Sequence, residues 1–357
     1  MKNRRIALLV FSSIGLLGFF AARPIAAAPS KANAAYIQKV ADGQMAPAGM
    51  AEKAGKNGWW ASSWSKTDGS GFFGKPVPLS SATENDDTNI VVRYTRYTTD
   101  YDVEFHAPVW GAYTVDKVAV SNDLSGERTA GNPDFARPSK FFQEPLVVAL
   151  SAHLGVPAAS HDTFTDAIDP LYPPKKAKGD PANIQRGHMV PNNAMKCQGT
   201  YEEGQTAQLE SFSVANIVPQ MAKSNAPSWS ALESACLDWA NELGQVWLIV
   251  GPVFHDRQHP TFEEKRTTHE KEIVPCPDEL FYVVIGKRNG KTSAIGFLMP
   301  HIPENVDFKT KAVPVQKIQE LTGLNFMPDL GEPNAIEATY DPAWLQTPVR
   351  KASKDDN

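Results

Sequence analysis

From about residue 89 the chain shows short apolar runs separated by turn residues, a pattern typical of a sheet. Residues 90–98 and 107–115 are rich in β-branched and aromatic side chains, so each segment predicts a strand. Residues 245–254 are strongly apolar, end in a Gly-Pro turn and predict another strand. Two more strands are predicted at residues 280–285 and 293–299. On this pattern, the chain beyond residue 89 folds around several strands.

Apolar residues at helical spacing predict a helix that follows residue 224. Asn225 or Ser228 caps its start, Pro227 lies in its first turn and Gly244 ends it. The residues that recur at helical spacing, and so face a core, are Trp229, Leu232, Cys236, Trp239, Ala240 and Leu243.

Four other segments beyond residue 120 also have predictable structure. Residues 121–139 predict a polar loop, and residues 212–218 predict a short buried strand. Residues 313–324 predict the end of a strand and then a helix that Gly323 caps. After residue 328 the chain is rich in Pro, Lys and Asp, so residues 336–357 are predicted to form a flexible tail.

The N-terminal part has two sections with different compositions. Residues 1–34 combine a basic start, an apolar run over 6–20 and small residues at 32–34, which predicts a cleaved signal peptide. An uncleaved anchor is the alternative, and a mitochondrial address is disfavoured because the apolar run is continuous. We therefore expect a secreted or periplasmic protein with no stable membrane association after cleavage.

Residues 35–88 show little periodicity and predict an extension of the main domain, which spans 89–335. Trp59, Trp60 and Trp64 in this extension favour packing on that domain. A platform that stacks nucleobases is the alternative interpretation of the three rings.

Composition limits the class of protein and of partner. The chain has 357 residues, of which 42% are hydrophobic and 21% charged, typical of a globular protein with one large domain or two modest ones. The net charge is −5, and the first 34 residues hold five basic and no acidic side chains, so their removal would leave −10. An acidic protein argues mildly against nucleic acid as a partner, unless a local cleft gathers Arg and Lys around a divalent cation.

Three cysteines lie far apart in the chain, without the spacing of metal ligands. In an exported protein they allow one disulfide and one remaining thiol. Burial of all three thiols is the equal alternative. The residues concerned are Cys197, Cys236 and Cys276.

The candidate chemistry begins at Gln185-Arg186-Gly187-His188. Arginine supplies a fixed fork of donors that suits phosphate, and histidine accepts a proton near neutral pH. Glycine between them lets a substrate or a second strand approach the backbone. The triplet fits attack on a phosphodiester, although an ordinary turn with a solvated Arg is the simpler interpretation of these residues alone.

A second segment makes the motif more specific. Residues 215–220 read Ala-Asn-Ile-Val-Pro-Gln, and Asn225 then precedes a helix that carries Trp229 and Glu233. Together the segments resemble the DNA/RNA non-specific endonucleases, whose signature is D-R-G-H, then S-N-I-x-P-Q, then an Asn and a Glu on one helix. The resemblance covers about residues 91–330. It implies an α+β, ββα-metal (His-Me finger) nuclease fold with a central, mostly antiparallel sheet flanked by helices.

The resemblance implies a role for each motif residue. His188 is the general base that activates water, and Arg186 grips a phosphate. Asn225 is the single protein ligand of Mg²⁺, for which Mn²⁺ is a substitute, and Glu233 holds metal-bound waters. Asn216 supports the catalytic set by hydrogen bonding. The alternatives are a helix cap for Asn225, a solvated helix face for Glu233 and a purely structural role for Asn216.

Two positions depart from the pattern of the family. Lys140 stands where some members carry a substrate-binding Arg, and Arg137 is close by in sequence, so both are candidate phosphate ligands. Gln185 stands where the family usually has Asp, which removes a negative charge but keeps a hydrogen-bonding group.

The resulting hypothesis is an exported, Mg²⁺-dependent endonuclease that cuts DNA and RNA with little sequence preference. A phosphodiesterase acting on small nucleotides and a catalytically weakened nucleic-acid-binding protein are the alternatives. Homodimers occur in the family, so a homodimer is a further expectation.

Overall fold

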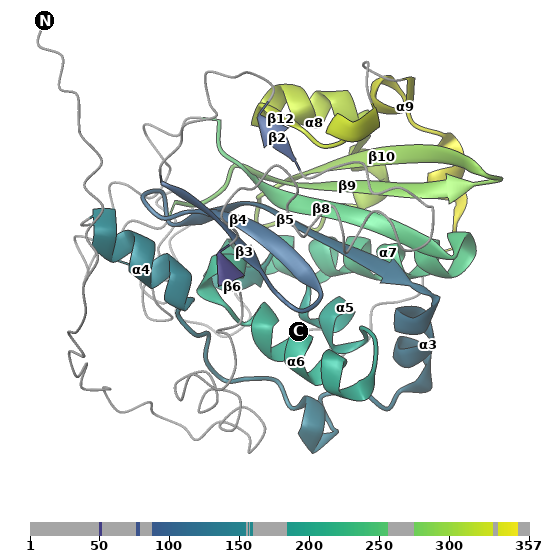
Figure 1. Cartoon of the computed structure of the whole chain (residues 1–357). Helices are drawn as coiled ribbons and strands as arrows, with labels where there is room; N and C mark the ends of the chain where they lie inside the picture. The colour runs from purple at the N-terminus through teal and green to yellow at the C-terminus, as the bar shows by residue number, and fades with distance from the viewer. Residues whose placement is uncertain are drawn as a thin grey trace, which may run out of the picture.

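The structure is a computed structural model, and it describes residues 50–51, 76–78, 88–154, 156, 158–159, 184–255, 275–330 and 335–348. Its centre is an eight-stranded sheet in the order β1-β3-β4-β5-β8-β9-β10-β11, in which every neighbouring pair is antiparallel (Figure 1). Its strands are β1 (Met50–Ala51), β3 (Asn89–Arg93), β4 (Tyr97–Asp102), β5 (Ala107–Asp116), β8 (Gln245–Val253), β9 (Glu279–Arg288), β10 (Lys291–Pro300) and β11 (Ala312–Val313).

Two smaller sheets and the helices surround this sheet. β6 (Ile184–His188) pairs with β7 (Ile217–Met221), and β2 (Val77–Pro78) pairs with β12 (Leu324–Asn325). The α-helices are α3 (Lys117–Ser125), α4 (Pro145–Leu154), α5 (Asn192–Lys196), α6 (Tyr201–Ser211), α7 (Ser230–Leu243), α8 (Val315–Thr322) and α9 (Ala335–Ala338). None of the helices in these described ranges has the length and apolar character needed to cross a membrane.

The central strands are apolar throughout because helices cover both faces of the sheet. Side chains alternate between the two faces of a strand. In β8, Val246 and Leu248 enter the core that contains Trp239 of α7, whereas Trp247 and Ile249 enter the core that contains Ile318 of α8. Figure 1 shows α7 on one side of the sheet and α8 with α9 on the other. The continuous apolar run predicted as a strand is thus a strand buried on both faces.

Several predicted boundaries are wrong. The predicted strand over 90–98 is two strands, β3 and β4, joined by a turn in which the Tyr94 N–H donates to the Tyr97 carbonyl at 2.8 Å. Part of the predicted 121–139 loop is helical, because Asp116 caps α3 through the Ala119 N–H and Gly126 ends it in the left-handed region. In the predicted strand 212–218, residues 214–216 form a 3-10 turn, and β7 begins only at Ile217.

The structure tests the predictions for the cysteines and part of those for the N-terminal region. All three cysteines are buried and unbridged, so burial rather than a disulfide is confirmed. The predicted signal peptide over 1–34 and Trp59, Trp60 and Trp64 lie outside the described residues. Of the predicted 35–88 extension, residues 50–51 and 77–78 form β1 and β2.

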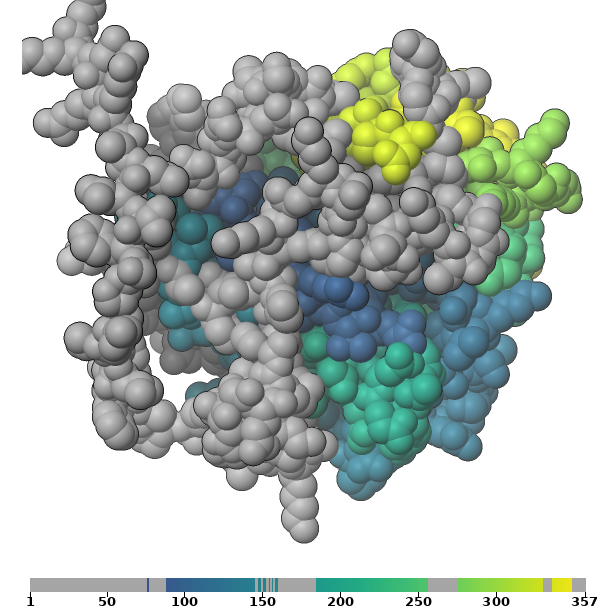
Figure 2. Space-filling model, in the orientation of Figure 1, coloured from purple at the N-terminus to yellow at the C-terminus, as the bar shows by residue number. Residues whose placement is uncertain are grey.

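The flexible tail predicted for 336–357 is wrong for the described residues 336–348. Trp344 is fully buried and lies 5.5 Å, ring to ring, from Trp239. Its indole N–H donates to the Ser293 hydroxyl at 2.9 Å, and its carbonyl accepts from the Trp239 indole at 2.9 Å. Figure 2 shows the C-terminal residues, in yellow, lying against the body of the molecule. A polar composition predicted mobility, but one aromatic side chain anchors the segment.

We expect the Trp344→Ala variant to lose about 3–5 kcal/mol of unfolding free energy, because it empties a buried site the size of an indole. Urea denaturation followed by circular dichroism measures this change. The matched control is Gln346→Ala at an exposed position two residues later, which should stay within about 0.5 kcal/mol of wild type. Equal stabilities for the two variants would show that the segment contributes nothing to the core.

Candidate active site

The candidate site is a cavity of about 640 Å³ between the β6–β7 pair, the segment that precedes α4, the start of α5 and the start of α7. Its walls carry most of the residues that the sequence motifs predicted. The charged and polar members of the wall include Arg137, Gln185, Arg186, His188, Lys223, Asn225 and Glu233.

The pairing of β6 with β7 explains how the motif presents its side chains. In the antiparallel β6–β7 pair, His188 faces Ile217 and Arg186 faces Pro219 across the register. Alternation along a strand places Arg186 and His188 on the same face and Gly187 on the opposite one. Both functional side chains therefore reach the cavity from a single short strand.

Gly187 is required because the neighbouring strand fills the space where its side chain would lie. A Cβ at this position would lie 1.9 Å from Oε1 and 2.6 Å from Cβ of Gln220. Gln220 is fully buried on β7, so its Cβ cannot move without moving the strand. The expected close approach of a second strand is the one found here.

We expect the Gly187→Ala variant to be less stable than wild type by about 1–3 kcal/mol, because the added methyl group overpacks the β6–β7 pair. Thermal unfolding measures the change. Gly131→Ala is the matched control, since its new Cβ would meet only the Thr129 hydroxyl at an ordinary 3.7 Å. A destabilisation no larger than that of the control would contradict the clash.

His188 is packed between two aromatic rings, Phe141 and Phe212, at the cavity wall. It is 8% exposed, and its ring centroid lies 5.1 Å from that of Phe141 and 4.8 Å from that of Phe212. Its Nε2 has no hydrogen-bond partner among the described residues. Burial holds the pKa of His188 well below its usual value, and the nearby Arg137 charge lowers it further. The imidazole is therefore neutral near neutral pH, with capacity to accept a proton.

Asn216 belongs to the scaffold of the site. It is fully buried, and its Oδ1 accepts from the Val190 N–H at 2.8 Å. Its Nδ2 donates to the carbonyls of Val190 at 2.9 Å and of Ser211 at 3.0 Å. These bonds fix the chain just after His188, and the side chain does not line the cavity. Asn216 therefore supports the site by hydrogen bonding, and a direct part in catalysis stays a prediction.

Asn225 and Glu233 reach the cavity from the segment that enters α7. Asn225 lies in a π-helical turn, Ser224–Trp229, and its Nδ2 donates to Oε1 of Gln185 at 2.8 Å. Glu233 lies in the first turn of α7 and lines the cavity. Neither the π-helical turn nor α7 has a side-chain cap at its start, so the interpretation of Asn225 as only a helix cap is wrong.

The two candidate phosphate ligands, Arg137 and Lys140, differ in whether they line the cavity. Arg137 lines the cavity, with its guanidinium carbon 5.4 Å from the Phe212 ring centroid. Surrounding protein lowers the pKa of Arg137, whereas the Glu233 charge raises it, so the two side chains interact electrostatically. Lys140 is not among the lining residues, so its place beside the substrate stays a prediction.

Lys223 is a lining residue that sequence reasoning missed. Its signal was a basic residue two positions before Asn225, at the end of β7. With Arg137 and Arg186, it gives the described cavity wall three cationic side chains against one carboxylate, that of Glu233. The cavity therefore has an excess of positive charge in a chain whose net charge is −5.

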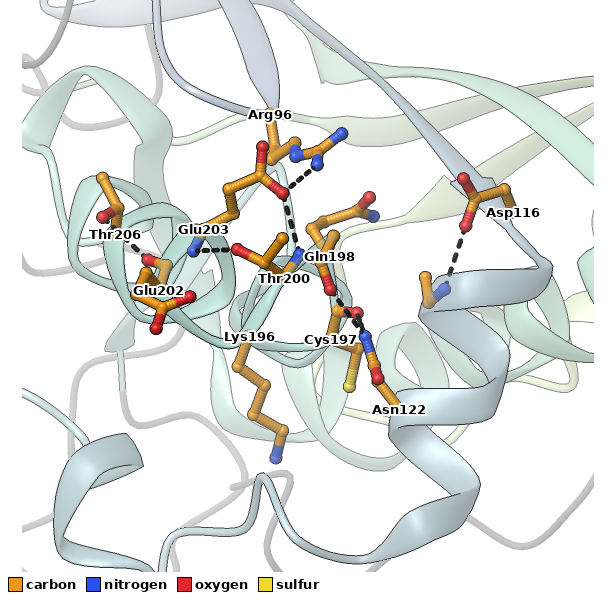
Figure 3. Close-up of polar contacts among 12 residues, drawn as sticks. Arg96, Asp116, Asn122, Lys196, Cys197, Gln198, Thr200, Glu202, Glu203 and Thr206 are labelled. Carbon is orange, nitrogen blue, oxygen red and sulfur yellow. Dashed lines mark hydrogen bonds and ion pairs between the residues drawn. The ribbon is translucent and has the colours of Figure 1, made fainter.

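Side chains that bind main-chain carbonyls anchor the α5 wall of the cavity. Asn122 donates to the carbonyls of Cys197 at 2.8 Å and of Gly199 at 3.0 Å (Figure 3). The buried Arg128 donates to the carbonyls of residues 196, 198 and 199. Thr200 and Glu203 form a capping box at the start of α6, and Arg96 pairs with that same Glu203, as Figure 3 shows. The wall is thus fixed by side chains that do not themselves line the cavity.

The donor set of the cavity fits a hard divalent cation. The described residues contain no cluster of three or more His, Cys, Asp or Glu side chains that could hold a metal. Mg²⁺ prefers oxygen and keeps several waters, so it needs only one or two protein oxygens. The Asn225 amide would offer one oxygen to such a cation, because its NH₂ group is bound to Gln185. Glu233 would offer a carboxylate in the same cavity.

Several known nucleases are similar in sequence to this chain. Nuclease EXOG, mitochondrial, from Xenopus laevis is 30% identical over 44% of this chain and 44% of its own length. The protein of the same name from Danio rerio is 24% identical over 66% of this chain and 60% of its own. The chain thus covers about half the length of these curated relatives. A crystal structure of the EndoG/EndoGI complex is similar at 16% identity and a TM-score of 0.44, over 70% of this chain and 89% of that chain.

These relatives contradict the expected secreted or periplasmic location, because they are named as mitochondrial nucleases, as is Nuclease 1 from Schizosaccharomyces pombe. A basic N-terminus without acidic residues is common to export signals and mitochondrial addresses. The continuity of the apolar run over 6–20 was an insufficient basis for choosing between them.

The arrangement and the family model agree. β6 carries the Arg-Gly-His motif and pairs with β7, and α7 with its preceding turn carries Asn225 and Glu233. Together these elements make the ββα unit beside a mostly antiparallel sheet. The model of the family described as DNA/RNA non-specific endonuclease matches residues 79–332. The chain therefore belongs to the DNA/RNA non-specific endonuclease family.

Proposed function

We propose that this chain is a divalent-metal-dependent endonuclease that hydrolyses phosphodiester bonds of DNA and RNA with little sequence preference. The observation that carries the proposal is a buried, neutral His188 whose Nε2 is unpartnered among the described residues, at the wall of a cationic cavity. A neutral imidazole with an unpartnered ring nitrogen can accept a proton, and cations beside it suit a polyanionic substrate.

Each lining residue has a place in this reaction. His188 removes a proton from the attacking water. Arg186, from the same strand as His188, and Arg137 bind the scissile phosphate and a neighbouring one. Asn225 and Glu233 would hold Mg²⁺ or Mn²⁺, Asn225 directly and Glu233 through bound waters. When bound, the cation would supply positive charge for the phosphate and the leaving oxygen.

The local charge supports a nucleic-acid substrate in spite of the acidic chain. Three cationic side chains line the described cavity wall, and they act at short range on a phosphate that enters it. Charges farther away than about 8–10 Å are largely screened at physiological ionic strength. The net charge of −5 therefore affects the rate at which the protein associates with nucleic acid more than the affinity of the cavity for a bound phosphate.

Cleavage of supercoiled plasmid and of single-stranded RNA by the purified chain tests the function. The reactions contain Mg²⁺, Mn²⁺ or EDTA, and a small chromogenic phosphodiester is run in parallel. We expect cation-dependent cleavage of both nucleic acids and none in EDTA. Cleavage of the small diester alone would replace the proposal by a phosphodiesterase of small nucleotides. Intact substrates from a folded protein would reject it.

The pH dependence of cleavage follows from the lowered pKa of His188. The base acts when neutral, and burial places its pKa below the usual 6.5. We therefore expect kcat to stay on its plateau as the pH falls through 6.5, and to decline only at more acidic pH. A pH–rate profile at saturating Mg²⁺ measures this, and a decline centred above pH 6.5 would contradict a neutral buried base.

The lowered pKa of His188 also makes the folding stability depend on pH. Because His188 has a lower pKa folded than unfolded, the unfolded chain binds a proton below pH 6.5 that the folded chain does not. His188 thus reduces stability as the pH falls below 6.5, until the folded chain also takes up the proton at the lowered pKa.

A further inference from the structure

The side chain of Asn225 is held by one residue outside its own helix. The backbone just after it is not helical, since Ala226 has φ −133° and ψ 120°. The hydrogen bond from Asn225 Nδ2 to Gln185 Oε1, at 2.8 Å, joins this kinked segment to β6. Gln185 is exposed and lines the cavity beside Asn225.

The direction of this hydrogen bond decides which end of the Asn225 amide faces away from Gln185. A carboxamide has an oxygen that accepts and an NH₂ group that donates. When the NH₂ group donates to Gln185, the oxygen is left for a cation. If the pair were reversed, Gln185 would donate to the Asn225 oxygen, and the NH₂ group would face the cation. Glutamine permits both directions, whereas a carboxylate can only accept.

We propose that Gln185 is a positioning residue, which aims the Asn225 amide oxygen at a divalent cation but leaves that orientation reversible. The proposal rests on the proposed metal-dependent function. A carboxylate at position 185 would fix the direction of the bond, and its charge would join that of Glu233 in the cavity. Gln185 therefore keeps the cation affinity of this chain below the value that its cavity could reach.

Two variants at position 185 separate the parts of this inference. Gln185→Glu has the same shape but only accepts, so we expect it to bind Mn²⁺ about 10-fold more tightly than wild type. Gln185→Met has similar length and no acceptor, so we expect binding about 10-fold weaker. Ser139→Asp is the matched charge control, because Ser139 lines the same cavity and has no described contact with Asn225.

Free Mn²⁺ is measured by electron paramagnetic resonance without nucleic acid, which makes the result independent of activity. Thermal unfolding of each variant confirms that it is folded, as expected for an exposed position. The expected order of affinity is Gln185→Glu, then Ser139→Asp, then wild type, then Gln185→Met.

The outcomes distinguish this inference from the function on which it rests. Absence of Mn²⁺ binding to wild type and all variants would reject the metal-dependent function itself. Binding by wild type with unchanged affinity in Gln185→Met would leave that function standing and overturn the positioning role. Equal tightening by Gln185→Glu and Ser139→Asp would attribute the effect to charge alone, which also overturns it.

Discussion

Replacement of His188 by alanine is expected to lower kcat for plasmid cleavage by roughly 10²–10⁴-fold, the usual contribution of a general base. The KM should change little, because the cations of the cavity wall remain in place to hold the phosphates. Steady-state rates at saturating Mg²⁺ measure both quantities. A smaller fall in kcat would mean that the attacking water loses its proton to some other group.

The control must separate loss of the base from loss of the fold, because His188 is packed against Phe141 and Phe212. His188→Gln fills more of the space beside these two rings than alanine does, and it is expected to be as inactive as the alanine variant. His255→Ala serves as the matched histidine control. His255 is exposed, pairs with Glu279 at 3.0 Å and does not line the cavity. Its removal should leave kcat within about twofold, as for surface substitutions away from such a site.

Replacement of Asn225 by alanine is expected to lower the rate at about 1 mM Mg²⁺ by roughly 100-fold or more, since outer-shell partners of a metal already contribute 10–100-fold. Part of the loss should be recovered at higher Mg²⁺, because Glu233 and the bound waters remain. A titration of rate against Mg²⁺ concentration measures the shift.

Asn225→Asp is the informative partner of the alanine variant. It keeps an oxygen where the amide oxygen lies, and Gln185 can donate to it after rotation of its own amide. We expect cation binding to be retained in Asn225→Asp and lost in Asn225→Ala. Equal loss in both variants would indicate that Asn225 maintains the kinked turn and does not bind the ion.

Local patterns predicted those parts of the structure that local forces determine. The apolar face of α7 and the doubly buried β8 follow from residue spacing. The predicted bounds of β8 are correct to within one residue, and α7 ends at Leu243 as predicted. The predicted start of the helix is wrong, because α7 begins only at Ser230, after the kinked turn that holds Asn225 and Pro227. The motif residues Arg186, His188, Asn225 and Glu233 do line one cavity.

Long-range contacts explain most of what the patterns missed. Nothing near Trp344 in sequence predicts its burial, because its partners Trp239 and Ser293 are 105 and 51 residues away. The scaffold role of Asn216 depends on Val190, which is 26 residues away. Spacing of apolar residues did not reveal α3, since its boundaries are set by a capping Asp116 and by Gly126.

One edge of the central sheet has a consequence for the behaviour of the protein in concentrated solution. An open edge strand presents unpaired N–H and C=O groups on which the strand of another molecule can align. Among the described residues, the sheet ends beside β10 in a strand of only two residues, Ala312–Val313. So short a strand offers little template for edge-to-edge pairing with another molecule.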